Sequence, residues 1–233
     1  KSVLFERRCH YLSTRLTEST SGLNTEHKRR SPSKDCINQN LNVQDVAQGY
    51  ESAGASGISV LTDMKYFGGS LEDLLTARAS CDMPLLRKEF IIDAYQIVEA
   101  KAYGADVILL IAAILTREEI QNFSTLAQSL GMEVLLEIHN EKELHKSVMP
   151  SLDMIGVNNR NLKTFDVSLE TSKKLSTLIP DEFVKISESG IRTVEDIQSL
   201  QPFGYKGFLI GENFMKTDDP GASAAAFIKQ LNG

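Results

Sequence analysis

The 233 residues are 42% hydrophobic, and 25 Lys and Arg against 31 Asp and Glu give a net charge of −6. This length is enough for one large domain or two small ones with a sizeable core. The modestly acidic balance gives no support for binding to nucleic acid or to a membrane surface.

The cysteines and the lack of a long apolar run predict a cytoplasmic protein. Cys9, Cys36 and Cys81 are far apart and form no Cys-x-x-Cys pair, a pattern that favours reduced thiols over a disulfide framework. No apolar stretch approaches the roughly 20 residues that are needed to span a bilayer. Residues 1–8 also lack the apolar core of a signal peptide.

Residues 1–20 precede the first predicted strand and are expected to form an N-terminal extension. Phe5, Tyr11 and Leu12 fit a helix in this extension, which would either cover the bottom of the fold or close over its mouth. The pattern alone does not separate these two arrangements.

Short apolar runs then recur at roughly the spacing of βα units. After a first strand that ends near Lys28, they lie at residues 57–61, 84–86, 106–111, 133–138, 154–157, 183–186 and 207–210. Runs this rich in Val, Ile and Leu suit strands buried on both faces of a parallel sheet. Eight such strands predict an α/β fold, a closed (β/α)8 TIM barrel formed by a single domain over residues 1–233. The alternative, a doubly wound open sheet, lacks the Gly-x-Gly-x-x-Gly turn expected after its first strand.

Helical segments lie between these strands and carry start and stop signals. Capping-box patterns that predict helix starts lie at Asp93/Gln96 and Thr116/Glu119, with a looser version at Ser70/Asp73. Glycines at positions 54, 104, 131 and 204 fall just past predicted helices, where C-terminal caps belong.

Five predicted strands end in polar side chains: Glu26/Lys28, Arg87/Lys88/Glu89, Glu137/His139, Asn158/Asn159/Arg160 and Ser187/Glu188/Ser189. Charged residues often end strands because loops are wet. In a (β/α)8 barrel, however, the carboxyl ends of the strands carry the active site, so five polar ends on one rim predict a site there. Glu26 and Lys28 are two residues apart, which puts both side chains on one face of their strand.

Glycines at the last two strand ends predict an anion site. Ser189-Gly190 and Gly211-Glu212 follow the seventh and eighth strands, where glycine lets backbone N–H groups approach a phosphate.

Two other features receive weaker interpretations. Phe67-Gly68-Gly69-Ser70 is predicted to be a flexible loop whose aromatic ring either stacks on a substrate or anchors the loop. His139 follows Glu137 by two residues, but no third ligand has metal-site spacing, so no metal is predicted.

Longer motifs resemble the indole-3-glycerol phosphate synthase family from about Gly22 to the C-terminus. They are Glu26-x-Lys28-Arg29-Arg30-Ser31-Pro32-Ser33, Ser59-Val60-Leu61-Thr62-Asp63, Tyr66-Phe67-Gly68-Gly69-Ser70, Leu86-Arg87-Lys88-Glu89-Phe90, Ile155-Gly156-Val157-Asn158-Asn159-Arg160, Ser187-Glu188-Ser189-Gly190-Ile191 and Phe208-Leu209-Ile210-Gly211-Glu212. The resemblance implies a lyase of tryptophan biosynthesis. Such an enzyme closes the indole ring of 1-(2-carboxyphenylamino)-1-deoxyribulose 5-phosphate with loss of CO2 and water. It implies no cofactor or metal, and a monomer that could associate with other enzymes of the tryptophan pathway.

The resemblance also implies roles for individual residues. Lys88 matches the principal general acid, Glu137 a catalytic acid/base, and Lys28 a group that moves protons and binds anionic parts of the substrate. The remaining matches are Glu26, Asn158 and Glu188 as orienting groups, Ser31, Ser189, Gly190, Gly211 and Glu212 as substrate or phosphate contacts, Phe67 and Phe90 as flanks of the anthranilate ring, and Arg160 as a carboxylate partner.

The chain departs from the family pattern in its first βα unit. Asn24, Thr25 and His27 stand where the family is usually apolar, which weakens the predicted strand, and Asp35-Cys36 stands where glycine is common. The N-terminal extension also looks shorter than usual, which bears on any lid over the substrate. We expect weakened activity, if present, to originate in this part of the chain.

Two other functions are compatible with the same strand ends. A Schiff-base aldolase would use Lys88 or Lys185 as its nucleophile, although Lys185 lies within a predicted strand rather than at its end. A non-catalytic barrel that binds sugar phosphates would tolerate the altered first strand.

Overall fold

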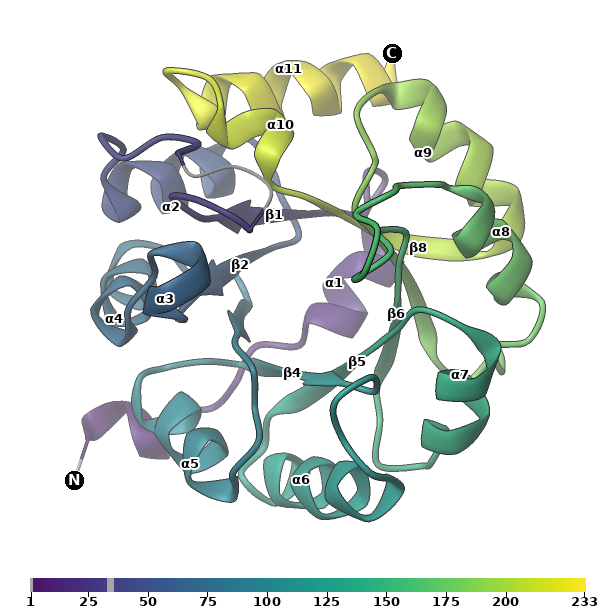
Figure 1. The fold of residues 1–233 in the computed structure, drawn as a ribbon. Helices are drawn as coiled ribbons and strands as arrows, with labels where there is room; N and C mark the ends of the chain where they lie inside the picture. Colours follow the sequence, from purple (N-terminus) through teal and green to yellow (C-terminus); the bar gives the residue numbers. More distant parts are fainter. Residues whose placement is uncertain (1, 33–35) are drawn as a thin grey trace.

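Eight parallel strands close into a barrel in the order β1 to β8 (Figure 1). The computed structural model describes residues 2–32 and 36–233. The strands are β1 Leu23–His27, β2 Gly57–Leu61, β3 Leu85–Lys88, β4 Val107–Ile111, β5 Glu133–Ile138, β6 Met154–Asn158, β7 Val184–Glu188 and β8 Tyr205–Ile210. Pairing of β1 with β8 closes the barrel, with Leu23 opposite Phe208. The predicted (β/α)8 barrel is therefore confirmed, and the open sheet is excluded.

Helices surround the barrel and connect its strands (Figure 1). They are η1 Val3–Glu6, α1 Leu12–Glu18, α2 Val43–Ser52, α3 Met64–Phe67, α4 Leu71–Ser80, α5 Ala94–Ala102, α6 Arg117–Ser129, α7 Glu141–Ser147, α8 Glu170–Ser176, α9 Val194–Leu200, η2 Gln201–Phe203, α10 Glu212–Met215 and α11 Pro220–Asn232. The predicted capping boxes at the starts of α5 and α6 are both formed. The four predicted cap glycines all have positive φ angles, as helix C-terminal caps require.

The helix α1 covers the bottom of the barrel, which settles the arrangement that the sequence left open. Leu12 and Leu16 are fully buried, and they pack with side chains from β3 to β7 in a cluster inside the barrel. Glu133, at the start of β5, accepts hydrogen bonds from the backbone N–H groups of Leu12 at 2.6 Å and Ser13 at 3.1 Å. In Figure 1 this helix crosses behind the strands. The interior is therefore filled from below and open only at its other end.

Asp106 anchors the segment that leads into α1. Its carboxylate is fully buried and accepts bonds from the backbone N–H groups of His10 at 2.8 Å and Leu85 at 2.9 Å. It also pairs with Arg78 at 2.8 Å and with Arg7. One carboxylate thus joins the N-terminal segment to β3 and α4.

The strand β1 forms despite its polar residues. Asn24 donates to the Ser59 hydroxyl at 3.1 Å, and the Thr25 hydroxyl donates to the Gly57 carbonyl at 3.0 Å. Both side chains are buried, and their donor groups find partners inside the sheet, while Asn24 Oδ1 has no partner in the described part of the chain. Asp35 and Ser33 of the following turn lie outside the described residues.

Candidate active site

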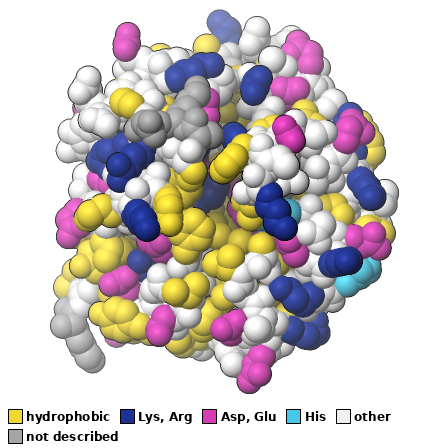
Figure 2. Space-filling model, in the orientation of Figure 1, with side chains coloured by type: hydrophobic (Ala, Val, Ile, Leu, Met, Phe, Trp, Pro, Cys, Tyr) yellow, Lys and Arg dark blue, Asp and Glu magenta, His cyan; other side chains and the backbone are white. Residues whose placement is uncertain are grey.

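A cavity of about 880 Å³ opens at the carboxyl ends of the strands. Figure 2 looks into this hollow, with hydrophobic side chains beside it. Thirteen of the residues predicted for the site line the cavity: Glu26, Lys28, Ser31, Phe67, Lys88, Phe90, Glu137, Asn158, Arg160, Ser189, Gly190, Gly211 and Glu212. The remaining one, Glu188, is fully buried beside Lys88.

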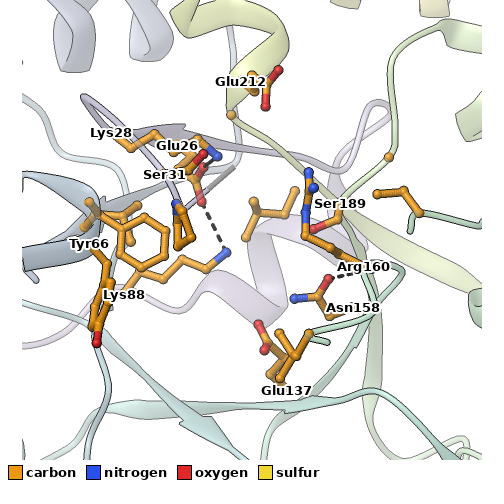
Figure 3. A pocket seen from close by; sticks show the side chains of 18 of the residues that line it. Glu26, Lys28, Ser31, Tyr66, Lys88, Glu137, Asn158, Arg160, Ser189 and Glu212 are labelled. Carbon is orange, nitrogen blue, oxygen red and sulfur yellow. Dashed lines mark hydrogen bonds and ion pairs between the residues drawn. The ribbon is translucent and has the colours of Figure 1, made fainter. Parts of the chain in front are cut away.

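Lys88 occupies the centre of the site between two buried carboxylates. Its Nζ lies 3.2 Å from Glu26 Oε2 and 3.1 Å from Glu188 Oε2. Lys28 approaches the other oxygen of Glu26 at 2.5 Å. Figure 3 shows Lys88 reaching toward Glu26, with Asn158 and Glu137 on the other side of the cavity. The strand ends of β1, β3 and β7 therefore place two ammonium groups and two carboxylates in one cluster.

The charges in this cluster fix one another's protonation. Burial alone would raise the pKa of Glu26, but Lys28 and Lys88 outweigh it and hold that pKa at about 2. Burial would lower the pKa of Lys88, but Glu26, Glu188 and Glu137 raise it well above its ordinary value. Burial also raises the pKa of Glu188 to about 7, against the opposing charge of Lys88. Lys88 is thus held protonated, and Glu188 titrates near neutral pH.

Two glycines leave room for the carboxylates. A Cβ at Gly211 would lie 2.2 Å from Glu26 Oε1, and one at Gly156 would lie 2.2 Å from Glu188 Oε1. Real Cβ atoms do not approach oxygen so closely, so neither carboxylate could keep its place beside an alanine. The glycines at these positions serve the close approach of a side chain, a reason that the sequence did not reveal.

Aromatic side chains cover one flank of the cavity. The rings of Phe67 and Phe90 lie 6.2 Å apart at an interplanar angle of 35°, and Tyr66 packs edge-on against Phe90. Phe67 is the last residue of α3 and so lies outside the loop, which begins at Gly68 and leads to Ser70, the predicted N-cap of α4. Asp63 caps this short helix by accepting from the Tyr66 N–H at 2.6 Å.

The opposite flank is built from the loop after β6. The side-chain oxygen of Asn158 accepts a hydrogen bond from the Arg160 backbone N–H at 3.0 Å. Arg160 also pairs with Val167 in an isolated antiparallel β-bridge. Leu162 and Phe165 of this loop also line the cavity and are about half exposed. No sequence signal marks these two residues, since they follow the strand end by several residues.

Three residues of the polar strand ends, Arg87, Asn159 and Ser187, point away from the cavity. Arg87 donates to the Gln96 carbonyl at 2.7 Å and pairs with Glu99 at 2.8 Å. Asn159 and Ser187 hydrogen-bond to each other at 3.0 Å. Neighbouring residues of a strand face opposite sides, so one of each adjacent polar pair must face the helices.

Basic residues that the sequence did not single out stand near the two predicted phosphate turns. Arg192 and Lys216 line the cavity together with Asn213, whose side chain donates to the Arg192 carbonyl at 2.9 Å. The sequence feature that could have identified these residues is their position, a few residues after Gly190 and Gly211. Ser189 and Gly190 themselves both have positive φ angles, 65° and 83°.

Other features bear on the alternative chemistries. Lys185 faces the helices, where its Nζ donates to the Ser176 carbonyl at 3.0 Å and to Asp181 at 3.2 Å, so it does not reach the cavity. Lys88 is held protonated, whereas a Schiff-base lysine needs a free amine. Among residues 2–32 and 36–233, no group of three or more His, Cys, Asp or Glu side chains is arranged to hold a metal ion.

Comparisons with known proteins agree with the motifs. A family model described as indole-3-glycerol phosphate synthase matches residues 4–231. A protein named indole-3-glycerol phosphate synthase from Bacteroides thetaiotaomicron is 49% identical over 216 residues, 93% of this chain and 83% of that protein. One of the same name from Chromobacterium violaceum is 48% identical over 196 residues, 84% of this chain and 74% of that protein.

Solved structures share the fold at low identity. A structure titled KGPDC from Streptococcus mutans has a TM-score of 0.68 at 13% identity, covering 91% of this chain and 97% of its own. A structure of the tryptophan synthase complex from Pyrococcus furiosus has a TM-score of 0.65 at 14% identity, covering 91% and 98%. At these identities the likeness shows the barrel fold alone.

Proposed function

The chain belongs to the indole-3-glycerol phosphate synthase family, decarboxylating lyases of tryptophan biosynthesis, and we propose how its residues divide the work of that reaction. The substrate is 1-(2-carboxyphenylamino)-1-deoxyribulose 5-phosphate. An aromatic carbon attacks the ketone, CO2 leaves, and loss of water completes the indole ring. The observation that carries the proposal is Lys88 Nζ held between Glu26 and Glu188, at 3.2 and 3.1 Å, inside the cavity.

Lys88 is the general acid of the ring closure. Attack on the ketone develops negative charge on its oxygen, which a protonated amine can neutralise by giving up a proton. Glu26 and Glu188 hold the ammonium group charged before the step and aim it into the cavity. Burial of both carboxylates excludes water as a competing partner, so these contacts are strong.

Glu137 and Lys28 serve the later proton transfers. Dehydration needs an acid at the leaving hydroxyl and a base for the proton that is lost. Glu137 lines the cavity from the end of β5. Lys28 lies beside Glu26 at the end of β1, across the barrel from β5. Asn158 orients the sugar hydroxyls between them.

The two ends of the substrate bind on opposite flanks. The phosphate lies against the backbone of Ser189, Gly190, Gly211 and Glu212 and the Ser31 side chain, where glycine permits close approach. The anthranilate ring lies against Phe67 and Phe90, and Arg160 pairs with its carboxylate from the loop across the cavity. A cavity of about 880 Å³ is large enough for this substrate.

Replacing Lys88 tests the assignment. Indole fluorescence follows product formation, and Lys88→Met should lower kcat at least about a hundredfold, the usual contribution of a general acid, while the substrate still binds. Lys173→Met is the matched control, because Lys173 pairs with Glu170 at 2.8 Å on the outer helix α8. Turnover by Lys88→Met equal to that of the control would refute the role of Lys88. Borohydride trapping of a covalent adduct with substrate would instead support the aldolase.

We further propose a single cooperative domain, with residues 1–20 as its extension, that acts as a cytoplasmic monomer. All three cysteines are free, in keeping with a reducing compartment. No helix in the described part of the chain is long and apolar enough to cross a membrane. One calorimetric transition and a monomer mass by light scattering are expected for the protein alone, and a larger mass after other enzymes of the tryptophan pathway are added would reveal association.

A further inference from the structure

His139 lies directly behind Glu137 and has no part in the roles assigned above. Its Nε2 is 3.4 Å from Glu137 Oε1, and its Nδ1 is 3.1 Å from Glu143 Oε2. The imidazole side chain is only 10% exposed. Within the described ranges Nε2 has no hydrogen-bond partner of good geometry. The ring therefore lies between one carboxylate that faces the cavity and another on α7.

Glu143 is held rigidly on the far side of the ring. Its Oε2 also accepts the His139 backbone N–H at 2.8 Å, and its Oε1 accepts from the Asn140 side chain at 2.6 Å. Asn140 in turn caps α7 by accepting from the Glu143 N–H at 3.0 Å. Because a fixed carboxylate faces Nδ1, that nitrogen carries a proton in either charge state of the ring.

A charged ring carries a second proton on Nε2, which then faces the Glu137 carboxylate 3.4 Å away. Glu137 from β5 and Glu143 from α7 lie on the two sides of the ring, and the charge of Glu188 from β7 also acts on it. Burial alone would lower the pKa of His139, but the hydrogen bond to Glu143 and these three charges raise it. The surroundings therefore favour the protonated ring.

We propose, given the function assigned above, that His139 is a positioning residue that orients the Glu137 carboxylate and shares one proton with it. The charged ring lies 3.4 Å from the Glu137 carboxylate and fixes its orientation in the cavity. During dehydration Glu137 takes one proton from the ring intermediate, and the Glu137–His139 pair gives one proton to the hydroxyl, which leaves as water. The pair returns to its starting state, and no net proton is consumed.

The test compares two histidines of the same region. His139→Gln removes the titrating ring, while His145→Gln is the matched control. His145 stands in the same kind of pair with Glu141 at 3.2 Å, but its side chain is 67% exposed. Both variants are assayed by indole fluorescence across pH 5 to 9. His139→Gln should lower kcat about tenfold or more, leave KM within about twofold, and move the acidic limb of the kcat profile to higher pH. The control should match the unaltered protein.

Several outcomes overturn the proposal. Unchanged kcat in His139→Gln refutes it, and so does a lower kcat with an unmoved pH profile, which marks a structural effect only. Absence of turnover in the unaltered protein refutes the proposed function instead, and thus distinguishes the two failures.

An NMR measurement covers the case in which His139→Gln does not fold. Ring 15N spectra of the unaltered protein should show Nδ1–H and a protonation midpoint above 6.5, and Glu143→Gln should lower that midpoint. A midpoint that Glu143→Gln leaves unmoved, or a neutral ring with its proton on Nε2, overturns the proposal.

Discussion

Replacing Glu188 by glutamine should stabilise the protein at neutral pH while removing much of its turnover. Glu188 is fully buried, and its Oε2 lies 3.1 Å from Lys88 Nζ. Its second oxygen has no hydrogen-bond partner in the described part of the chain. Burial raises the pKa of this carboxyl from 4.5 to about 7, and the nearby Glu137 and Glu26 add to the effect against the opposing charge of Lys88.

The size and sign of the effect follow from this pKa. The raised pKa contributes stability that is fully present below pH 4.5 and is lost as the pH rises through 7. A change from 4.5 to about 7 corresponds to about 3 kcal/mol, at about 1.4 kcal/mol for each pH unit. Glutamine keeps the shape but cannot ionise. The advantage of the variant over the unaltered protein should therefore rise from near zero at pH 4.5 to about 3 kcal/mol at pH 7.

Thermal melts at a series of pH values measure this gain. About 3 kcal/mol corresponds to roughly 6 to 12 °C in Tm for a chain of this size. Glu170→Gln is the control, because this side chain is 76% exposed, and its melting curve should follow that of the unaltered protein at every pH. In Glu188→Gln, Lys88 keeps only Glu26 as a close partner, so kcat should fall about tenfold or more. A Tm difference that stays constant from pH 4.5 to 8 would refute the raised pKa, and an unchanged kcat would refute the support of Lys88.

Two further predictions concern the floor and the rim of the barrel. Asp106→Ala should lower the free energy of unfolding by about 3 to 5 kcal/mol because it leaves Arg78 buried without its partner. A Tm within 2 °C of the unaltered protein would contradict this. The control is Asp181→Ala, which changes an exposed side chain and should leave Tm unchanged. Gly211→Ala should displace Glu26, whose Oε1 would lie 2.2 Å from the new Cβ, and lower kcat about tenfold or more. At Gly131 an added Cβ would have no atom within 4 Å. This glycine has a positive φ angle, so an alanine there carries backbone strain, but Gly131→Ala should retain full kcat. Equal kcat in the two glycine variants would exclude the proposed clash at Gly211.

The strands after β1 could be predicted from the sequence because each is a largely buried apolar run, whereas β1 carries the polar residues Asn24, Thr25 and His27. Their apolar runs leave no competing interpretation, and β2 and β5 begin and end at the predicted residues. Helix starts at Thr116 and Asp93 could be predicted because a capping box is a local pattern of two side chains.

Features that depend on distant contacts could not be predicted. The extension could have covered either end of the barrel, because Leu12 and Leu16 form an apolar pair that suits any apolar surface. Glu133 and Asp106 accept hydrogen bonds from backbone N–H groups of the N-terminal segment. In the sequence they look like ordinary polar residues at the starts of strands. The order of charges within Arg87-Lys88 likewise gave no indication of which side chain faces the cavity, because that depends on strand register.

Sequence also explains why the candidate rim residues are grouped but not how they interact. Alternation along a strand places Glu26 and Lys28 on one face, yet the pairing of Lys88 with both Glu26 and Glu188 joins three strands across the barrel. Such a contact requires the barrel to close. The pKa shifts of these three groups result from this contact, and so they could not be predicted from the sequence either.

The position of α1 has a consequence for synthesis on the ribosome. Leu12 emerges early, whereas its packing partner Ile186 in β7 follows about 170 residues later. At typical translation rates of about 5 to 20 residues per second, roughly 9 to 35 s separate the two. During this interval the two leucines of α1 lack their final surface and are available to chaperones. The helix that closes the bottom of the barrel is thus synthesised before the strands against which it packs.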